Sequence, residues 1–371
     1  MRMLIAGGGT GGHLFPGIAV AEEFLARDPR NEVLFVGTER GIEARVLPKS
    51  GYQLECISTT GMRGKSALSK VKGVWLLLRG YAQSRKIIRS FQPDLVLGVG
   101  GYASGPLVLA ARNCSCKCFI HEQNALPGLT NRILAKVVKK VFISLEESRR
   151  HVPAAKLLLT GNPLRRQILE KLHEEIKPTG NGNGNGNGNG NRNGKGFRLL
   201  VFGGSAGAHR INMAMIEALP ELAALRERIT ITHQTGEQDL EEVRQAYQAE
   251  GFCAEVVPFI DNMAEAYQKA DLILCRAGAT TIAEVTACGK ACIFVPYPYA
   301  TDDHQRKNAE ALVDKGAGFM ILDRELSGKR LTAMIEELER NPHVRKLAGQ
   351  KAAAMARPDA AKLIVDAMLA A

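Results

Sequence analysis

The stretch Met3-Leu4-Ile5-Ala6-Gly7-Gly8-Gly9-Thr10-Gly11-Gly12-His13 determines the predicted fold. It contains four apolar residues, then a glycine-rich turn, and then a helix-like run that begins near Pro16. A short apolar run that ends in glycines and leads into an amphipathic segment is typical of a buried parallel strand in a βα unit. The stretch therefore predicts the first βα unit of a doubly wound α/β domain, in which ligands bind beyond the carboxyl ends of the strands.

Similar apolar runs recur in two series along the chain. The first series comprises residues 3–6, 33–36, 95–97, 119–120 and 141–143, and the second comprises 199–202, 229–232, 256–257, 272–275, 293–295 and 319–321. Two series predict two doubly wound domains that face a cleft. Residues 180–196 between them are a nearly pure Asn-Gly alternation without apolar side chains. We expect this tract to be a disordered loop inserted in the second domain.

Composition restricts the class of protein and of partner. The chain has 371 residues, 45% of them hydrophobic, which suffices for two ordinary domains. Its formal net charge of +11 favours an anionic partner, such as phosphate, nucleic acid or acidic lipid. The eight cysteines are few for the length, and the cluster at 114–118 lacks zinc-type spacing. No signal peptide or membrane-spanning run is recognisable, so we expect a soluble protein of a reducing compartment.

Three glycine loops follow predicted strands, at residues 7–12, 98–106 and 203–208. Each alone is explained by a tight turn, but three at strand ends favour binding of a phosphate or diphosphate. Gly7, Gly9 and Gly12 also satisfy the dinucleotide fingerprint. That fingerprint requires an acid at the end of the second strand, where this chain has Gly37 and Thr38. The sequence therefore disfavours a nicotinamide-dependent oxidoreductase.

Polar clusters follow other predicted strands. They are His121-Glu122-Gln123-Asn124, the run from Arg276 to Glu284, and the run 296–308. Small residues and two threonines precede Glu284, which suits a helix N-terminus that faces a diphosphate while the carboxylate accepts from the ribose hydroxyls. The alternative is that Glu284 only complements the helix dipole.

Taken in order, several motifs resemble one family. They are Gly8-Gly9-Thr10-Gly11-Gly12-His13, Gly100-Gly101-Tyr102, His121-Glu122-Gln123-Asn124, Gly161-Asn162-Pro163-Leu164-Arg165, Gly204-Ser205-Ala206-Gly207-Ala208, Arg276-Ala277-Gly278-Ala279-Thr280-Thr281 and Asp303-His304-Gln305. Nearly the whole chain resembles the bacterial MurG family of peptidoglycan N-acetylglucosaminyltransferases. The resemblance implies a GT-B fold and inverting transfer of N-acetylglucosamine (GlcNAc) from UDP-GlcNAc to the muramyl 4-hydroxyl of lipid I, which gives lipid II. It also implies roles in cell-wall biogenesis, cell shape and cell division.

The resemblance implies a domain division and a donor site. The first domain covers 1–162, with a C-terminal helix 345–371 packed back on it, and the second covers 163–344. Ile260 would hold uracil, Arg165 the nucleotide end and Glu284 the ribose. The remaining implied donor contacts are Ala279, Thr280, Thr281 and Ser205 at the diphosphate, Asn124 and Gln305 at the GlcNAc, and Thr10, Gly11 and Gly12 from the first domain. His304 occupies a place where some members have glutamine.

Inversion requires a base that deprotonates the acceptor hydroxyl and groups that stabilise the departing UDP. His13 is the first candidate because its reference pKa is ~6.5, and Glu122 is the reserve. Alternatively, His13 orients the glycine loop or binds an acceptor phosphate. The chain has no Asp-x-Asp metal motif near the predicted nucleotide site, and we expect neither a metal nor a cofactor.

Residues 56–93 contain no Asp or Glu but many Lys and Arg. Among them lies an apolar patch with basic neighbours, formed by Lys72, Val74, Trp75, Leu76, Leu77, Leu78 and Arg79. Such a segment suits an anionic membrane surface, and the run 136–140 extends it. The alternative is a core helix with a solvated basic face. With a lipid-linked substrate, we expect a peripheral protein on the cytoplasmic face of the inner membrane, near other cell-wall synthesis proteins.

Three alternative functions remain. Another GT-B glycosyltransferase would share the donor loops and differ in its acceptor. A Rossmann oxidoreductase is opposed by the sequence, because the acid that would bind the ribose is missing. A basic RNA-binding protein would need aromatic stacking platforms, and 5% aromatic content without an RNA-binding motif favours no nucleic-acid partner.

Overall fold

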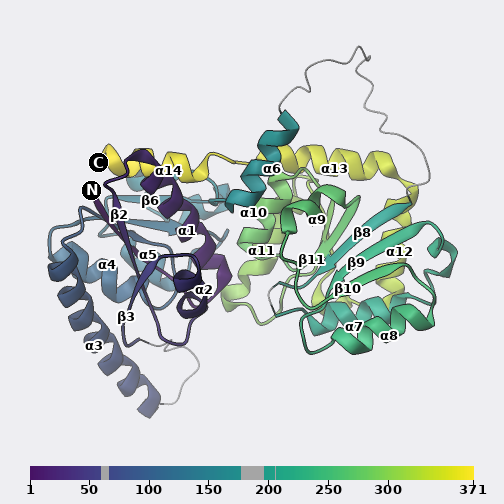
Figure 1. Cartoon of the computed structure of the whole chain (residues 1–371), viewed down its shortest axis with the longest axis horizontal. Helices are drawn as coiled ribbons and strands as arrows, with labels where there is room; N and C mark the ends of the chain where they lie inside the picture. The colour runs from purple at the N-terminus through teal and green to yellow at the C-terminus, as the bar shows by residue number, and fades with distance from the viewer. Residues whose placement is uncertain (60–66, 177–195, 205) are drawn as a thin grey trace. The chain divides into compact units, whose positions relative to one another are not determined.

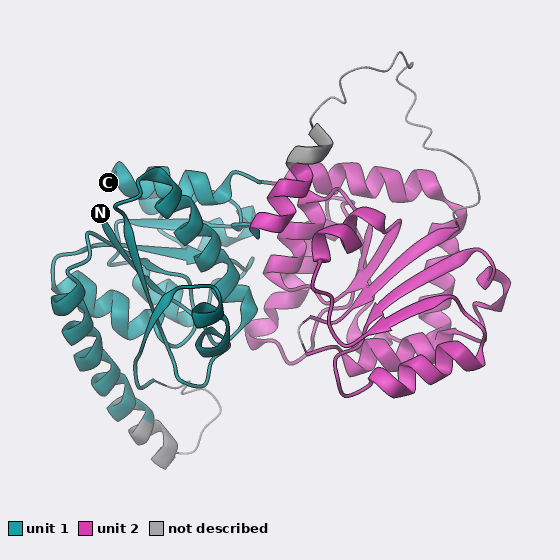
Figure 2. Cartoon of the chain, viewed as in Figure 1, with its two compact units in different colours: residues 1–165, 357–371 teal, residues 166–356 magenta. Residues whose placement is uncertain are grey.

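The computed structural model describes residues 1–59, 67–176, 196–204 and 206–371, without the side chains of 67–72, 74 and 173–176. Each half of the described chain is built on one parallel sheet (Figure 1). Unit 1 holds residues 1–165 and 357–371, and unit 2 holds residues 166–356 (Figure 2). The first segment of unit 1 thus ends at residue 165, three residues beyond the expected boundary at 162. Of the Asn-Gly tract, 180–195 lies outside the described residues.

Unit 1 contains a seven-stranded sheet in the order β3-β2-β1-β4-β5-β6-β7. Its strands are β1 (Arg2–Ala6), β2 (Glu32–Gly37), β3 (Gln53–Cys56), β4 (Leu95–Gly98), β5 (Lys117–Glu122), β6 (Lys140–Ile143) and β7 (Leu157–Leu159). The pairs are parallel throughout. Because β1 lies between β2 and β4, the strand order reverses at β1, which is the switch point where doubly wound sheets bind ligands.

Helices cover both faces of the unit 1 sheet (Figure 1). They are α1 (Gly11–Arg27), α2 (Glu43–Lys49), α3 (Ala67–Phe91), α4 (Ser104–Asn113), α5 (Leu129–Leu134) and α14 (Ala360–Leu369), with 3-10 turns at Glu146–His151 and Ala154–Lys156. Met3 and Ile5 of β1 pack with residues of α1 and α14, whereas Leu4 and Ala6 pack with α4 and α5. Burial on both faces explains the unbroken apolar run of the first strand.

Unit 2 repeats this plan with a six-stranded parallel sheet in the order β10-β9-β8-β11-β12-β13. Its strands are β8 (Phe197–Phe202), β9 (Ile229–Gln234), β10 (Ala254–Val257), β11 (Leu272–Cys275), β12 (Cys292–Phe294) and β13 (Phe319–Met320). Its helices are α6 (Arg166–Ile176), α7 (His209–Ala218), α8 (Leu240–Ala249), α9 (Met263–Lys269), α10 (Ala279–Ala287), α11 (His304–Val313), α12 (Gly328–Arg340) and α13 (Pro342–Met355), with 3-10 turns at Ala223–Leu225, Thr301–Asp303 and Asp323–Glu325. The two doubly wound sheets confirm the predicted fold class.

The structure differs from the sequence prediction in two helices. Helix α1 begins at Gly11 rather than near Pro16, so the last glycines of the first loop and His13 form its first turn. The expected helix 345–371 is instead two helices, α13 in unit 2 and α14 in unit 1. Pro358 follows Arg357 between them, and the residue before a proline is disfavoured in helical conformation.

Helix α14 completes the core of unit 1 although it lies at the other end of the sequence. Ile364, Val365 and Met368 are fully buried and pack with residues of α1 and β1. An ion pair of 2.8 Å joins Arg27 of α1 to Asp366. The last residues of the chain therefore cover apolar surface that the first residues would otherwise expose.

Truncation of Ile364 tests this packing. We expect Ile364→Ala to lower the free energy of unfolding of unit 1 by about 2–5 kcal/mol, because it opens a cavity in a closed core. Leu363, its neighbour, is 42% exposed, so Leu363→Ala should change stability by less than about 0.5 kcal/mol. Denaturant unfolding of both variants measures the difference, and equal losses would contradict the assignment of α14 to this core.

Candidate functional site

The first glycine loop of unit 1 ends in the first turn of α1. Gly9 has a left-handed φ of +82°, Thr10 is extended, and the helix begins at Gly11. The hydroxyl of Thr10 lies 3.3 Å from Nδ1 of His13. The structure thus brings Thr10, Gly11, Gly12 and His13 into one helix N-terminus, which is the positive end of the helix dipole.

The loop after β4 packs directly against the first loop. A β-carbon on Gly101 would lie 2.4 Å from the carbonyl oxygen of Gly8, and one on Gly100 would lie 2.5 Å from Cδ2 of the His13 ring. Ser104 fixes the second loop because its hydroxyl accepts from the N–H of Gly100 at 3.0 Å. The half-buried His13 imidazole therefore lies against glycine backbone, which sets the place of its ring.

Glu122 lies buried at the carboxyl end of β5 and accepts four hydrogen bonds. Its Oε1 accepts from the backbone and side-chain nitrogens of Asn124, at 3.0 and 3.2 Å. Its Oε2 accepts from Gly128 N at 3.2 Å and Asn131 Nδ2 at 2.8 Å. Burial raises the pKa of Glu122, and these bonds oppose the increase. The carboxyl group thus orients Asn124, and both its oxygens are occupied by donors of the same unit.

His121, beside it, is fully buried and neutral. Burial lowers the pKa of His121 to about 4. The Gln123 amide donates to its Nδ1 at 3.1 Å, so the ring proton resides on Nε2, which lies 3.1 Å from the Gly161 carbonyl. This imidazole links β5 to the segment after β7 and is not placed as a base.

Arg165, the last residue of the first part of unit 1, lies beside α1. Its guanidinium carbon is 5.6 Å from the centroid of the Phe15 ring, a cation–π distance. The same ring would lie 2.9 Å from a β-carbon on Gly11. Arg165 is therefore placed next to the helix turn that carries Thr10 and His13.

In unit 2, α10 begins with small residues after β11. Ala279, Thr280 and Thr281 form its first turn, which contains no acidic residue. Glu284 follows in the second turn and is buried, with Tyr267 Oη donating to its Oε2 at 3.0 Å. A helix N-terminus without an acid attracts an anion such as a diphosphate.

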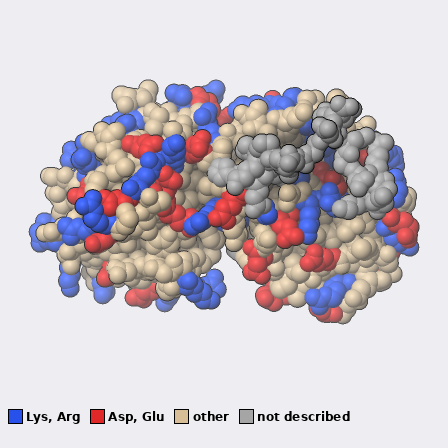
Figure 3. All heavy atoms as spheres, turned by 45° about the horizontal axis from the view of Figure 1, so that its top comes forward, with Lys and Arg blue, Asp and Glu red and all other residues tan. Residues whose placement is uncertain are grey.

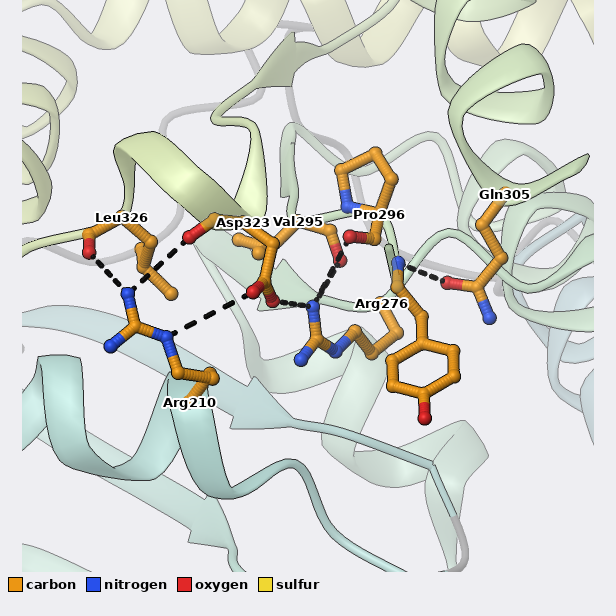
Figure 4. A network of polar contacts seen from close by, with 8 residues as sticks. Arg210, Arg276, Val295, Pro296, Gln305, Asp323 and Leu326 are labelled. Atoms are coloured by element: carbon orange, nitrogen blue, oxygen red, sulfur yellow. Dashed lines mark hydrogen bonds and ion pairs between the residues drawn. The ribbon is translucent and has the colours of Figure 1, made fainter. Parts of the chain in front are cut away.

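A polar network holds the loop after β12 in place (Figure 4). The buried Arg276 donates to the carbonyls of Val295 and Pro296, both at 3.2 Å, and pairs with Asp323 at 2.5 Å. Asp323 also lies between Arg276 and Arg210 in this view. Next in the chain, Tyr297 N donates to Oε1 of Gln305 at 3.0 Å, so the amide oxygen of Gln305 is the accepting end and its nitrogen the donor end.

A buried chain of hydrogen bonds supports the glycine loop after β8. Asn212 donates from Nδ2 to Asp239 Oδ2 at 2.7 Å and to Thr235 O at 2.9 Å, so its Oδ1 accepts from Nε2 of His233. Nδ1 of His233 then accepts from the hydroxyl of Tyr247 at 3.0 Å. Burial lowers the pKa of His233 to about 3, so this imidazole is neutral in the folded protein.

Acid should destabilise unit 2 through His233. The unfolded state binds a proton near pH ~6.5 and the folded state does not, so stability falls as the pH decreases below that value. Between pH 7 and 5 the expected loss from this group is about 2 kcal/mol. Denaturant unfolding at both pH values should show the loss in the wild type and in an exposed-site control, His343→Gln, but reduced in His233→Gln. An unchanged pH difference in His233→Gln would contradict the assignment.

The remaining predicted residues vary in how they are placed. Ser205 lies outside the described residues, and Ile260 is half-buried in the loop after β10. Nδ1 of His304 donates to the Thr301 carbonyl at 2.7 Å, in the 3-10 turn that precedes α11. No group of His, Cys, Asp and Glu suited to a metal ion occurs among the described residues.

Helix α3 carries the predicted membrane patch. Trp75 is 56% exposed and Leu78 is 63% exposed, with the Arg79 guanidinium 5.5 Å from the Trp75 ring. Leu77 is also exposed and Leu76 half-buried, while the side chains of Lys72 and Val74 are outside the described part. On the face drawn in Figure 3, basic and acidic side chains are interspersed. Within the described ranges, no helix has the length and apolar content needed to span a bilayer.

Sequence reasoning missed the acids and partners that hold these loops. Asp323, Tyr267, Asp239 and Asn212 support the loops of unit 2, and Glu43 is wholly buried below the first loop of unit 1. None of them lies in a glycine-rich motif. The only sequence signal for Glu43 is its place after Gly37 and Gly41, and that signal is weak.

Residues 3–143 match the glycosyltransferase family 28 N-terminal domain, and residues 198–364 match the C-terminal domain of the same family. A protein of Geobacter sulfurreducens is 62% identical over 371 residues, which is 100% of this chain and 98% of that protein. It is named UDP-N-acetylglucosamine–N-acetylmuramyl-(pentapeptide) pyrophosphoryl-undecaprenol N-acetylglucosamine transferase.

Solved structures agree with these matches. The crystal structure of Acinetobacter baumannii MurG superposes with a TM-score of 0.79 at 31% identity and covers 100% of this chain and 99% of its own. A UDP-GlcNAc 2-epimerase from Neisseria meningitidis, with a TM-score of 0.67 at 14% identity over the full length of both chains, shares the fold alone. With both halves matched and relatives this similar over their full length, the chain belongs to glycosyltransferase family 28 and, within it, to the MurG family.

Proposed function

We propose that this enzyme transfers GlcNAc from UDP-GlcNAc to undecaprenyl-pyrophosphoryl N-acetylmuramyl-pentapeptide, lipid I, and so produces lipid II. The observation that carries the proposal is the 62% identity, over the whole chain, to a protein named for this reaction. Both glycosyltransferase domains are present, and α10 of unit 2 offers an N-terminus suited to a diphosphate.

The donor is assigned mainly to unit 2. Ala279, Thr280 and Thr281 take the diphosphate at the N-terminus of α10, and Glu284 takes the ribose hydroxyls from the second turn of that helix. The Tyr267 bond to Oε2 supports the ribose role because it fixes the carboxylate. Ile260 is assigned to uracil and Ser205 to the diphosphate. Gln305 suits a sugar hydroxyl because its amide nitrogen remains the donor.

The acceptor and the base are assigned to unit 1. His13 takes the proton of the muramyl 4-hydroxyl, whose oxygen bonds to the anomeric carbon as the bond to the UDP oxygen breaks and UDP leaves with the electron pair. The position of His13 beside Thr10 and against Gly100 supports this choice. Glu122, with both oxygens already accepting, is the weaker candidate. Thr10, Gly11, Gly12, Asn124 and Arg165 are assigned to the donor sugar and nucleotide.

Two substitutions separate donor binding from turnover. We expect Glu284→Ala to raise the KM for UDP-GlcNAc about 10- to 100-fold, because the variant loses hydrogen bonds to a charged group. We expect His13→Ala to lower kcat about 10²- to 10⁴-fold, the range for general-base catalysis. Transfer of labelled GlcNAc to a lipid I analogue measures both. The exposed residues Glu255 and His151 provide matched controls, Glu255→Ala and His151→Ala.

The same assay decides between acceptors. If the folded wild type binds UDP-GlcNAc but transfers no GlcNAc to the lipid I analogue, the donor assignment stands and the assignment of lipid I as the acceptor is wrong. If UDP-GlcNAc gives no thermal stabilisation, the donor assignment fails as well.

The enzyme is assigned to the cytoplasmic face of the inner membrane as a peripheral protein. A lipid-linked acceptor requires access to the bilayer, and exposed Trp75, Leu77 and Leu78 on α3 provide apolar surface beside basic residues such as Arg79. Leu76, Lys72 and Val74 are assigned to the same contact.

Vesicle binding tests the membrane contact. We expect the double substitution Trp75→Ala, Leu78→Ala to weaken binding to anionic vesicles at least about tenfold, because it removes two large apolar side chains. Leu347 on α13 is similarly exposed, at 43%, so Leu347→Ala is the control and should bind like the wild type. Binding should decrease with salt. Equal binding of the double variant and the control would reject α3 as the contact.

A further inference from the structure

The first residue of α2, Glu43, lies wholly buried beneath the glycine loop that leads into α1. Its Oε2 accepts from the N–H of Gly9 at 2.7 Å. Its Oε1 accepts from the N–H of Thr38 at 2.8 Å and from the Thr38 hydroxyl at 2.9 Å. Both oxygens accept from N–H groups, which is the pattern of a carboxylate and one that a neutral amide cannot reproduce.

Three glycines enclose this carboxyl group. A β-carbon on Gly8, Gly37 or Gly41 would lie 2.2, 2.5 or 2.0 Å from the nearest atom of the Glu43 side chain. Gly41 does not have a left-handed backbone, so only the space taken by Glu43 excludes a larger residue there. The turns after β1 and β2 are therefore both shaped around one carboxylate.

The bond to Gly9 is the one that reaches the candidate site. Gly9 directly precedes Thr10, and Thr10 is both the N-cap of α1 and the neighbour of the His13 ring. In loops of this type the backbone N–H groups commonly bind an external anion. Here a side chain of the same unit binds the Gly9 N–H, so the carboxylate holds the loop from below.

We propose that Glu43 is a positioning residue for GlcNAc transfer, which holds the Gly9 backbone so that Thr10 meets the donor sugar and His13 meets the acceptor in the reactive geometry. The proposal rests on the function and on the role of His13 proposed above. Glu43 does not contact substrate; it acts through the loop. Displacement of a reacting group by about 1 Å is enough to lower a rate ~10²-fold.

Three variants isolate this effect. Glu43→Gln keeps the size of the side chain but turns an N–H donor towards one of the N–H groups that Glu43 accepts from. Thr38→Val keeps the shape and removes only the hydroxyl bond to Oε1. Glu39→Gln removes the same charge from an exposed position four residues away and is the control.

The first measurement is amide hydrogen exchange of the free protein. We expect segments 7–13 and 37–43 to exchange about tenfold faster in Glu43→Gln, and roughly threefold faster in Thr38→Val, since one ordinary hydrogen bond is lost there. The strands of unit 2 should exchange as in the wild type, and Glu39→Gln should match the wild type throughout.

The second measurement is turnover. We expect kcat to fall about 10- to 100-fold in Glu43→Gln and roughly threefold in Thr38→Val, with unchanged affinity for UDP, which lacks the sugar. The proposal is overturned if exchange in segment 7–13 does not change, if it changes equally in Glu39→Gln, or if the loop loosens and kcat does not fall. If Glu43→Gln does not fold, Thr38→Val decides by the same criteria. Absence of GlcNAc transfer in the wild type would reject the proposed function. The exchange data would still test whether Glu43 holds the Gly9 loop in place.

Discussion

The structure depends on the close approach of backbone at the carboxyl ends of the strands. In unit 1, Gly101 meets the Gly8 carbonyl, and in unit 2 a β-carbon on Gly207 would lie 1.9 Å from the Thr235 carbonyl. No side chain fits at either position, so loops from neighbouring strands pack directly on each other. This contact places the helix N-termini that follow the loops at one edge of each sheet, the edge at which doubly wound sheets bind ligands.

Buried polar side chains then determine the conformation of these loops. Glu122, Asp239 and Glu43 each accept several hydrogen bonds from nearby donors, and each lies under a loop rather than in solvent. A buried acceptor that lost its donors would carry a large desolvation cost, so such networks hold one loop conformation. His13, Arg165 and Gln305, which we propose as ligand contacts, are by contrast half-buried.

The sequence predicted the central strands well because both of their faces are buried and they read as unbroken apolar runs. It missed β3 and β7, which are the edge strands of unit 1. In β3 exposed residues alternate with half-buried ones, so this strand lacks the apolar signal of a central strand. In contrast, β7 consists of three leucines, which are only half-buried because they lie at the edge of the sheet. The site loops were predicted from their glycines. Glu43 and Asp323 were not, because their importance comes from contacts distant in sequence. The residue roles themselves followed from resemblance, which propensity and periodicity do not supply.

The division of unit 1 into two sequence segments has a consequence for synthesis of the protein. Helix α14 covers Met3, Ile5 and Phe24, yet all of residues 166–356 are translated between those residues and α14. At ~5–20 residues per second, translation of that stretch takes about 10–40 s. During this time one face of the first sheet is without its last helix, and unit 2 is complete before unit 1. A nascent chain of this topology therefore presents apolar surface on its first-translated unit throughout that interval, although that unit is the one nearest the N-terminus.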